Sequence, residues 1–304
     1  MMEGILPIYK ETGMTSHDVV FKLRKILHTK KVGHAGTLDP NVDGVLPIAI
    51  GKATKSIEFL QDAGKVYTGT ITLGFSTTTE DLDGEVVEEV TQLDPLSVEM
   101  IDQGLAKLEG DIIQIPPMFS AVKVNGRRLY DYARAGETVE RPKRDATIYE
   151  FKRTSEPIFD AMTQTQTFAF KAVVSKGTYI RTLAVDFGKQ FALPSVMSQL
   201  TRQSAGGFTL AESHSLADVA TEMEKTGNID DWLLPIDRAV AQYPSVALPD
   251  DIWQFVKNGV GLPADLYPKK SERIVITHNR EVKSVFEWSD RKQQYRPYRT
   301  FKNE

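Results

Sequence analysis

Apolar and polar positions follow two different periods along the chain, and these periods predict strands and helices. Between Tyr67 and Leu73 the larger apolar residues alternate with three threonines, which predicts a half-buried strand. Two further strands are predicted over 146–154 and 167–175, on either side of an irregular polar stretch.

Helical spacing is clearest after the pair Thr15-Ser16, which is typical of a helix N-cap. An apolar stripe follows this pair at Val19, Leu23, Ile26 and Leu27. Further helices are predicted over 96–108, 179–191 and 216–224. Since helices and strands alternate without a regular βαβ rhythm, we predict an α+β fold with a mixed, largely antiparallel central sheet and flanking helices.

A domain boundary is predicted near Tyr243-Pro244, which divides the chain into residues 1–243 and 244–304. The second part should be a small β-rich C-terminal module with a short helix over 250–258. Its three predicted strands cover 273–277, 282–288 and 295–301. This basic module can be either a structural appendage or an RNA-gripping domain, and its sequence fits both.

The chain has 304 residues and no cysteine, which excludes disulfides, thiolate catalysis and cysteine-ligated zinc. No apolar run approaches the roughly 18 residues that a membrane span needs, and the N-terminus does not resemble a signal peptide. We therefore expect a cytoplasmic protein without a membrane partner.

The net charge of −4 argues weakly against a nucleic-acid partner, but it hides a segregation of charge. Residues 19–38 contain five Lys or Arg and no acid, and residues 121–144 contain seven basic residues against three acidic ones. Residues 267–304 contain ten against five, whereas residues 80–102 contain nine acids and no Lys or Arg. Phosphate backbones require local basic surface, so RNA stays open as a partner, although each basic run can also be a solvated face.

The loop from His34 to Gly44, HAGTLDPNVDG, contains a candidate nucleophile, Asp39. The following proline favours an extended backbone at Asp39, and Asp43-Gly44 is predicted to form a turn. Such a loop presents a carboxylate to a cleft, although an isolated Asp-Pro pair is far more often structural. The segment also matches the first half of a calcium loop, but its twelfth position would be Ile50, which has no carboxylate.

Other metal and phosphate sites find no support in the sequence. The five histidines are scattered without metal-ligand spacing, so no metal is expected. A phosphate loop at Gly51-Lys52 fails because Ala53 stands where Ser or Thr is required.

Two more clusters suggest a catalytic carboxylate and an RNA substrate. In SKGTYIRTL, residues 175–183, Arg181 lies on the first turn of a predicted helix, where the helix dipole disfavours a cation. A carboxylate partner would explain that placement. Residues 116–130, PPMFSAVKVNGRRLY, interleave aromatic and basic side chains, a pattern suited to base stacking and phosphate contact.

With these clusters the chain resembles the TruB family of bacterial tRNA pseudouridine synthases. The matching stretches are GMTSHDVV, KVGHAGTLDPNVDGVLPIAIGKATK, KVYTGTITLGFSTTTEDLDG, PPMFSAVKVNGRRLYDYARAG, SKGTYIRTLAVDFG and LTR at 200–202. They occur in the family's order and cover most of residues 5–210. One departure is that Lys10 is followed by Glu11, where the family usually has Lys-Pro. The last 60 residues resemble the family's PUA-like module only loosely.

The resemblance implies the pseudouridine synthase fold and isomerisation of uridine 55 in the T loop of tRNA, without cofactor or metal. It implies Asp39 as nucleophile, Arg181 as its ion-pair partner and Tyr67 as the ring that stacks on the flipped base. It also implies substrate contacts by His34 as a wedge, Tyr179, Leu200, Lys123 and Arg202. The expected partner is the T stem-loop of tRNA, with no obligatory protein partner and a monomeric state.

Several alternatives stay open. A pure RNA-binding protein or tRNA folding chaperone would need the basic surfaces but not Asp39. A carbohydrate hydrolase would need a second carboxylate, for which Asp43 is the nearby candidate. Attack on the sugar C1′, attack on the base C6 and a route through a glycal all fit the same residues.

Overall fold

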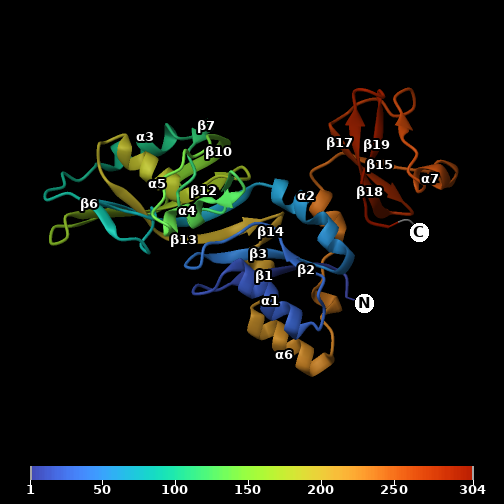
Figure 1. Cartoon of the computed structure of the whole chain (residues 1–304), viewed down its shortest axis with the longest axis horizontal. Helices are drawn as coiled ribbons and strands as arrows, with labels where there is room; N and C mark the ends of the chain where they lie inside the picture. The colour runs from blue at the N-terminus through green and yellow to red at the C-terminus, as the bar shows by residue number, and fades with distance from the viewer. Residues whose placement is uncertain (1, 303–304) are drawn as a thin grey trace. The chain divides into compact units, whose positions relative to one another are not determined.

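Two compact units make up the chain in the computed structural model, which describes residues 2–302 (Figure 1). Unit 1 consists of three separate segments, Met1–Asn41, Val45–Ala63 and Gly206–Glu304. Unit 2 consists of Val42–Gly44 and Gly64–Ala205. Within residues 2–302 no helix is long and apolar enough to cross a membrane.

The core of unit 2 is a sheet in which β13, β4, β12, β10 and β7 are antiparallel neighbours in that order. Beyond β13 the sheet continues with a parallel partner, the first residues of β3. The predicted α+β fold with a mixed, largely antiparallel sheet is thus confirmed. The strands are β3 (Asp43–Ile50), β4 (Lys65–Leu73), β7 (Gly110–Gln114), β10 (Arg144–Arg153), β12 (Thr165–Val174) and β13 (Ser195–Ala205), and β11 (Ile158–Asp160) pairs with β12.

Two helices, α3 (Val98–Ala106) and α5 (Ile180–Lys189), cover one face of this sheet, as Figure 1 shows. Every second residue of β12 is buried, and the ring of Phe168 meets that of Phe187 on α5 at 5.2 Å. The amide of Gln190 donates to the carbonyl of Gly104 on α3 at 3.0 Å, which ties the two helices together. The alternation predicted for these strands is therefore the alternation between the helix-covered face and the opposite face.

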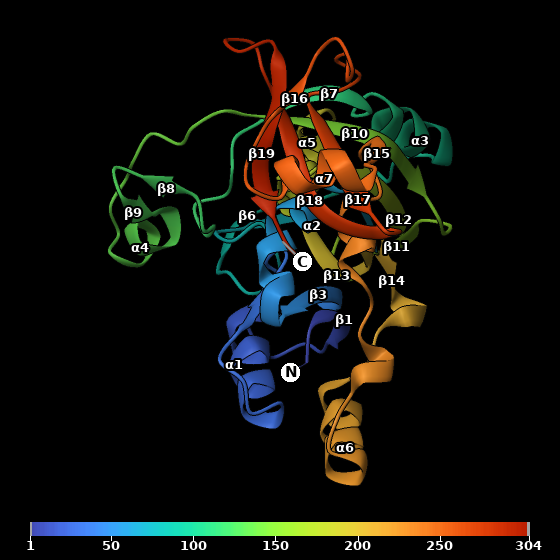
Figure 2. The same cartoon turned by 90° about the vertical axis from the view of Figure 1, so that its right-hand side faces the viewer.

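Two small hairpins extend unit 2. One pairs β5 (Phe75–Thr77) with β6 (Val86–Glu89). The other pairs β8 (Lys123–Val124) with β9 (Arg127–Arg128) and leads directly into α4 (Leu129–Arg134), which Figure 2 shows as one small substructure. Asn125 and Gly126 both have positive φ, of 52° and 81°, as a tight Asn-Gly hairpin turn requires.

Unit 1 begins with β1 (Gly4–Lys10), α1 (Ser16–Ile26) and β2 (Val32–His34), followed by most of β3, η1 (Gly51–Ser56) and α2 (Ile57–Asp62). The predicted N-cap is confirmed, because the hydroxyl of Thr15 accepts from the backbone of Asp18 and the Asp18 carboxylate accepts from Thr15 in return. The predicted turn at Asp43-Gly44 is wrong: the turn lies at Pro40-Asn41, and Asp43 begins β3.

Strand β1 is the neighbour of β3 in the large sheet and also bonds to segments far along the chain. Ile5 exchanges both backbone hydrogen bonds with Leu234, and the N–H of Tyr9 donates to the carbonyl of His214. The same late segment contains β14 (Phe208–Thr209), η2 (Leu210–Glu212), α6 (Leu216–Thr226), η3 (Asp230–Trp232) and η4 (Ile236–Val240), and α6 packs against α1. Residues from both ends of the sequence therefore form one core.

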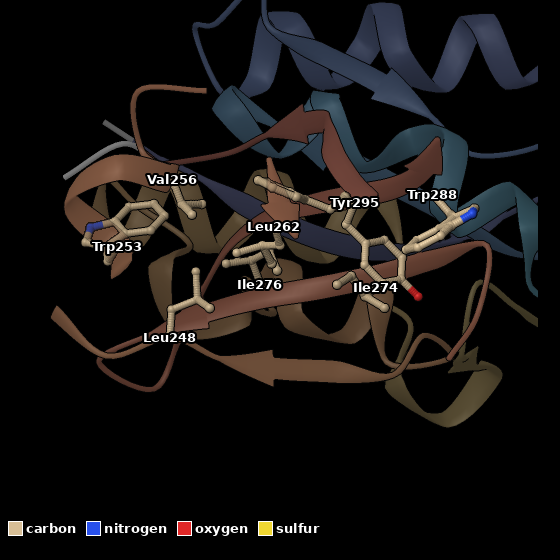
Figure 3. Close-up of a cluster of buried hydrophobic side chains, with 9 residues drawn as sticks. Leu248, Trp253, Val256, Leu262, Ile274, Ile276, Trp288 and Tyr295 are labelled. Carbon is tan, nitrogen blue, oxygen red and sulfur yellow. The ribbon is translucent and has the colours of Figure 1, made fainter. Parts of the chain in front are cut away.

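The last part of unit 1 is a five-stranded sheet in the order β15-β17-β18-β19-β16, with α7 (Asp250–Val256) beside it. Its strands are β15 (Ser245–Ala247), β16 (Leu262–Pro263), β17 (Arg273–His278), β18 (Glu281–Ser289) and β19 (Gln294–Thr300). Figure 3 shows its core, where Leu248, Trp253 and Leu262 pack with residues of the three longer strands. The predicted β-rich C-terminal module is present, whereas the boundary between 243 and 244 stays a prediction.

Helix α2 holds this C-terminal sheet through a buried ring and two ion pairs. Phe59 is fully buried and meets three rings edge-on at centroid distances of 5.9–6.1 Å: Tyr243, Tyr298 and Phe301. On the same helix, Glu58 pairs with Arg299, and Asp62 pairs with Arg273 at 3.4 Å. Burial of the Phe59 ring contributes more to stability here than the ion pairs do, since partly exposed ion pairs contribute little.

Candidate active site

Asp39 lies on the loop between β2 and β3, and both of its neighbours in sequence are held in place. The backbone N–H of Leu38 donates to the hydroxyl of Ser16 at 2.9 Å, and this serine is buried at the start of α1. On the other side, the carbonyl of Pro40 accepts from the backbone N–H of Gly13 at 2.9 Å. The half-buried side chain of Asp39 thus stands on a loop that is fixed at either end.

Lys10 supplies a third anchor for this loop. Its side chain has no exposed surface, and its ammonium donates to the carbonyls of Glu11 at 2.9 Å, Met14 at 2.7 Å and Pro40 at 3.1 Å. A buried cation is tolerated when it is well hydrogen-bonded, as this one is. In the sequence Lys10 stands out only for the residue that follows it, and nothing there marks it as an anchor.

His34 is the last residue of β2 rather than part of an irregular loop. Its half-buried imidazole meets the ring of His17 edge-on, with the ring centroids 5.2 Å apart and the planes at 76°. His17 lies on the first turn of α1, so two histidines from neighbouring elements are brought together.

At the end of the loop, Gly44 comes too close to β13 for any side chain. Asp43 and Gly44 pair in parallel with Thr201 and Arg202, and a Cβ at Gly44 would stand 2.3 Å from the carbonyl oxygen of Arg202. Its φ of +111° also lies in the range that favours glycine. The last glycine of the HAGTLDPNVDG stretch is therefore required by strand packing.

In unit 2 the structure brings Tyr67, Leu200 and Arg202 onto one face of the sheet. Arg202 lies directly opposite Tyr67 in the pairing of β13 with β4, and Leu200 lies opposite Gly69. Cross-strand partners point to the same side, so the three side chains share the face that α5 covers. Arg202 has no exposed surface, which favours support of the sheet over direct RNA contact.

Arg181 lies on the first turn of α5, as predicted, and it is almost completely buried. Its guanidinium donates to the carbonyls of Thr79 and Phe119, both at 2.9 Å, and lies 3.6 Å from the carboxylate of Asp81. The structure thus gives this arginine a carboxylate partner that sequence reasoning missed. Its pairing with Asp39, which belongs to the other unit, stays a prediction.

Glu80 and Asp81 are neighbours in the loop between β5 and β6, so this loop brings a second carboxylate close to Arg181. The φ of +66° at Glu80 is left-handed, which is uncommon for a residue with a side chain. The hydroxyl of Thr182 on α5 donates to its carboxylate at 3.0 Å. Burial raises the pKa of Glu80, and the Thr182 hydrogen bond and the charge of Arg181 oppose this rise only in part.

Tyr179 is the N-cap residue of α5, and its backbone forms two hydrogen bonds with the side chain of Gln114 at the end of β7. The N–H of Tyr179 donates to the Gln114 side-chain oxygen at 2.9 Å, and the Gln114 amide donates back to the Tyr179 carbonyl at 3.1 Å. Gln114 is buried and was also missed, because nothing in its sequence neighbourhood marks it.

Lys123 lies exposed on β8, within the cluster of interleaved aromatic and basic residues. Two arginines of this cluster lie over aromatic rings: the guanidinium of Arg127 lies 4.5 Å from the ring centroid of Tyr132 on α4, and that of Arg128 lies 5.5 Å from the ring centroid of Tyr130. The cluster therefore forms a basic surface with aromatic rings on the β8–β9 hairpin and α4. In residues 2–302 no three His, Cys, Asp or Glu side chains gather so as to hold a metal ion.

Comparison with known families decides the class of protein. The family model described as "TruB family pseudouridylate synthase (N terminal domain)" matches residues 24–180, more than half of the chain. The chain belongs to the TruB family. The match contains Asp39, Tyr67 and Lys123, together with Asp81 and Gln114 of unit 2. The resemblance seen in the sequence is confirmed, and the protein is an enzyme of the isomerase class.

Relatives in the TruB family are similar over their whole length. The tRNA pseudouridine synthase B of Latilactobacillus sakei is 56% identical over 302 residues, covering 99% of this chain and 98% of the relative. The enzymes of the same name from Lactiplantibacillus plantarum and Streptococcus gordonii are 51% and 48% identical, and each match covers 99% of this chain and 99% or more of the relative.

Solved structures show the same fold. A Cbf5–Nop10–Gar1 complex contains a chain that superposes with a TM-score of 0.74 at 26% identity, covering 98% of this chain and 85% of that one. The archaeal box H/ACA Nop10–Cbf5 complex gives a TM-score of 0.71 at 23% identity, covering 98% and 86% of the two chains. The pseudouridine synthase fold thus extends beyond the bacterial relatives.

Proposed function

We propose that this TruB-family enzyme converts uridine 55 in the T loop of tRNA to pseudouridine, with Asp39 as nucleophile and no cofactor. The observation that carries the proposal is the anchored loop of Asp39. On one side the N–H of Leu38 donates to the hydroxyl of Ser16, and on the other the carbonyl of Pro40 accepts from the ammonium of Lys10. Relatives named tRNA pseudouridine synthase B, 48–56% identical over 99% of this chain, support tRNA as the substrate.

The reaction breaks the bond between N1 of the base and C1′ of the ribose, turns the detached base and forms a bond from C5 to C1′. The proton on C5 is lost and N1 gains one, so the reaction is an isomerisation. Attack on C1′, attack on C6 and a route through a glycal all begin with Asp39 in its ionised form. A charged arginine lowers the pKa of a nearby carboxyl group and fixes its orientation, and we assign that function to Arg181.

The remaining residues bind the flipped nucleotide. A base inside a folded loop must be turned out before chemistry can occur, and an aromatic ring supplies a surface on which it can stack. We assign Tyr67 to this stacking and to proton transfer near the sugar. Tyr179 is a second aromatic residue of the site, Leu200 forms an apolar wall, and His34 occupies the space that the base leaves.

Basic surfaces bind the rest of the RNA. Lys123 and the guanidinium groups on the β8–β9 hairpin contact phosphates, while the buried Arg202 supports the sheet beneath Tyr67. We assign residues 1–243 to catalysis and residues 244–304 to RNA binding by the C-terminal module. The enzyme acts as a monomer in the cytoplasm, without a protein partner.

The test is Asp39→Asn with a T-arm stem-loop that carries tritium on C5 of the target uridine. We expect tritium release to fall by at least about a thousandfold, because an amide is a far weaker nucleophile, while the dissociation constant changes less than about threefold. Glu11→Gln, which neutralises an exposed carboxylate nearby, is the matched control and should release tritium as the parent enzyme does. Retained turnover in Asp39→Asn would exclude this aspartate as nucleophile.

The same assay separates the alternatives. A chaperone or pure RNA-binding protein would release no tritium in any form, including the parent protein. A hydrolase would liberate free uracil, which chromatography detects, instead of pseudouridine.

A further inference from the structure

An open groove lies between α1 and β2 of unit 1, and apart from His34 its residues have no assigned function. The groove has a volume of about 420 Å³ and is lined by His17, Phe21, Arg24, Val32, Gly33 and His34 among others. This volume falls within the range of sites that bind small organic groups. His34 forms part of its wall, so the groove adjoins the residue assigned to enter the T loop.

On the helix side, the groove is lined by a row of α1 residues that do not belong to the buried face of this helix. His17 and Phe21 are four residues apart and Arg24 follows three later, so all three lie on one side of α1. The buried stripe of α1 consists of other residues, among them Val19 and Leu23. Phe21 is 57% exposed, an unusual position for a large aromatic side chain on a basic helix.

Aromatic rings and cations alternate along this groove. The ammonium of Lys25 lies 4.4 Å from the ring centroid of Phe21, and the imidazole of His17 meets that of His34 edge-on at 5.2 Å. The guanidinium of Arg24 donates to the carbonyl of Val32 at 2.9 Å and so ties α1 to β2 across the groove. Rings beside cations are the arrangement by which proteins bind unpaired nucleotides: the base stacks and the phosphate meets the charge.

The rim of the groove carries more positive than negative charge. Lys25, Lys30 and Lys31 are exposed on α1 and the segment that follows it. The acid of this region, Asp18, also lines the groove and caps the helix N-terminus, where hydrogen bonds from the Thr15 hydroxyl and backbone hold its pKa below the usual range. An anionic ligand with a flat ring fits both the floor and the rim.

We propose that this groove binds one unpaired base of the RNA substrate, from a nucleotide near the target uridine, by stacking on Phe21 and His17. The proposal rests on the proposed function, because it takes the RNA loop to be open beside His34. The nucleotide's phosphate lies against the lysines of the rim. The groove thereby adds a second base contact and makes opening of the loop more favourable.

The test measures binding of T-arm stem-loops to Asp39→Asn protein, which removes turnover from the measurement. In one series each unpaired loop nucleotide is replaced in turn by an abasic one. We expect one abasic position to weaken binding about five- to hundredfold, the range for loss of one stacked base. Phe21→Ala should weaken binding of the unmodified RNA by the same factor and should not weaken binding of that abasic RNA further.

Three further variants sharpen the result. Phe21→Trp should bind the unmodified RNA at least as tightly as the parent, and Phe21→Leu should behave as the alanine variant does, because leucine keeps an apolar side chain without a ring. Lys22→Ala, on the same helix but outside the groove, should weaken all RNAs equally and lower the salt dependence. Since Phe21 is exposed, these changes leave the fold intact.

The proposal is overturned if Phe21→Ala binds every RNA as the parent does, or weakens native and abasic RNAs by equal factors at every position. The first result would mean that only phosphates contact this surface. Both are distinguishable from failure of the proposed function, in which protein with an intact Asp39 would release no tritium from C5 of the target uridine.

Discussion

Replacing Lys10 by methionine tests whether the loop of Asp39 depends on a buried cation. The change keeps the length of the side chain but removes three hydrogen bonds from an ammonium with no exposed surface. Hydrogen bonds to charged groups contribute roughly 1.5–3 kcal/mol each, so their loss alone would cost about 5–9 kcal/mol.

Two terms reduce this cost. The ammonium no longer has to be desolvated, which returns several kcal/mol. The carbonyls of Glu11 and Pro40 belong to exposed residues, so water can replace the lost donor at both. We therefore expect a net loss of about 2 kcal/mol in the free energy of unfolding, or about 4–8 °C in Tm for a unit of this size. Because the carbonyl of Pro40 follows Asp39 directly, kcat should also fall, by about ten- to hundredfold.

Urea unfolding and the tritium-release assay measure the two effects separately. Lys22→Met, at an exposed position on α1, is the matched control and should change stability by less than about 0.5 kcal/mol. If Lys10→Met unfolds at the same urea concentration as the parent and retains its kcat, then the buried ammonium does not anchor the loop and the reasoning is refuted.

Three other substitutions probe separate parts of the structure. Gly44→Ala would place a Cβ 2.3 Å from the carbonyl oxygen of Arg202, so we expect at least about 4 kcal/mol of destabilisation in urea unfolding, and a variant of normal stability would contradict the close approach. Glu80→Gln tests a carboxyl whose pKa burial raises above its ordinary 4.5: the parent should lose stability as pH rises from that value through the higher folded pKa, because the folded state then binds more protons than the unfolded one. The variant should gain stability relative to the parent over that rise, whereas a difference that is constant between pH 4 and pH 8 would argue against it. Phe59→Ala removes a fully buried ring that meets three others, and we expect a loss of about 3–5 kcal/mol by the same denaturation assay; a loss below 1 kcal/mol would mean that this cluster does not hold the C-terminal sheet.

The periodic elements could be predicted from the sequence because their cause is local. The strand around Tyr67 follows from alternation, and the start of α1 follows from the hydroxyl and carboxylate of Thr15 and Asp18, three residues apart. The turn before β3 was placed too late, since Asp43-Gly44 has turn chemistry but its backbone is taken up by pairing with β13. Tertiary pairing overrode a local preference there.

The partners of the site residues could not be predicted, because they depend on contacts between distant segments. Lys10 reaches a carbonyl thirty residues away, and Arg181 binds carbonyls of Thr79 and Phe119, which no side-chain pattern reveals. Gln114 recognises only the backbone of Tyr179. In each case a side chain binds main-chain atoms, and every residue type presents the same main-chain carbonyl.

Unit 1 is built from segments that are far apart in the sequence, and this limits the order in which the protein can fold during its synthesis. Unit 2 is nearly one continuous stretch, Gly64–Ala205, so its sheet can form while the rest of the chain is still being made. Strand β1 is synthesised first and its sheet neighbour β3 follows soon after, yet the bonds of Ile5 to Leu234 and of Tyr9 to His214 can form only after more than 200 further residues. The segment with the candidate nucleophile is therefore among the first to be synthesised, yet it belongs to a unit whose core is completed only when the residues after Gly206 have been made.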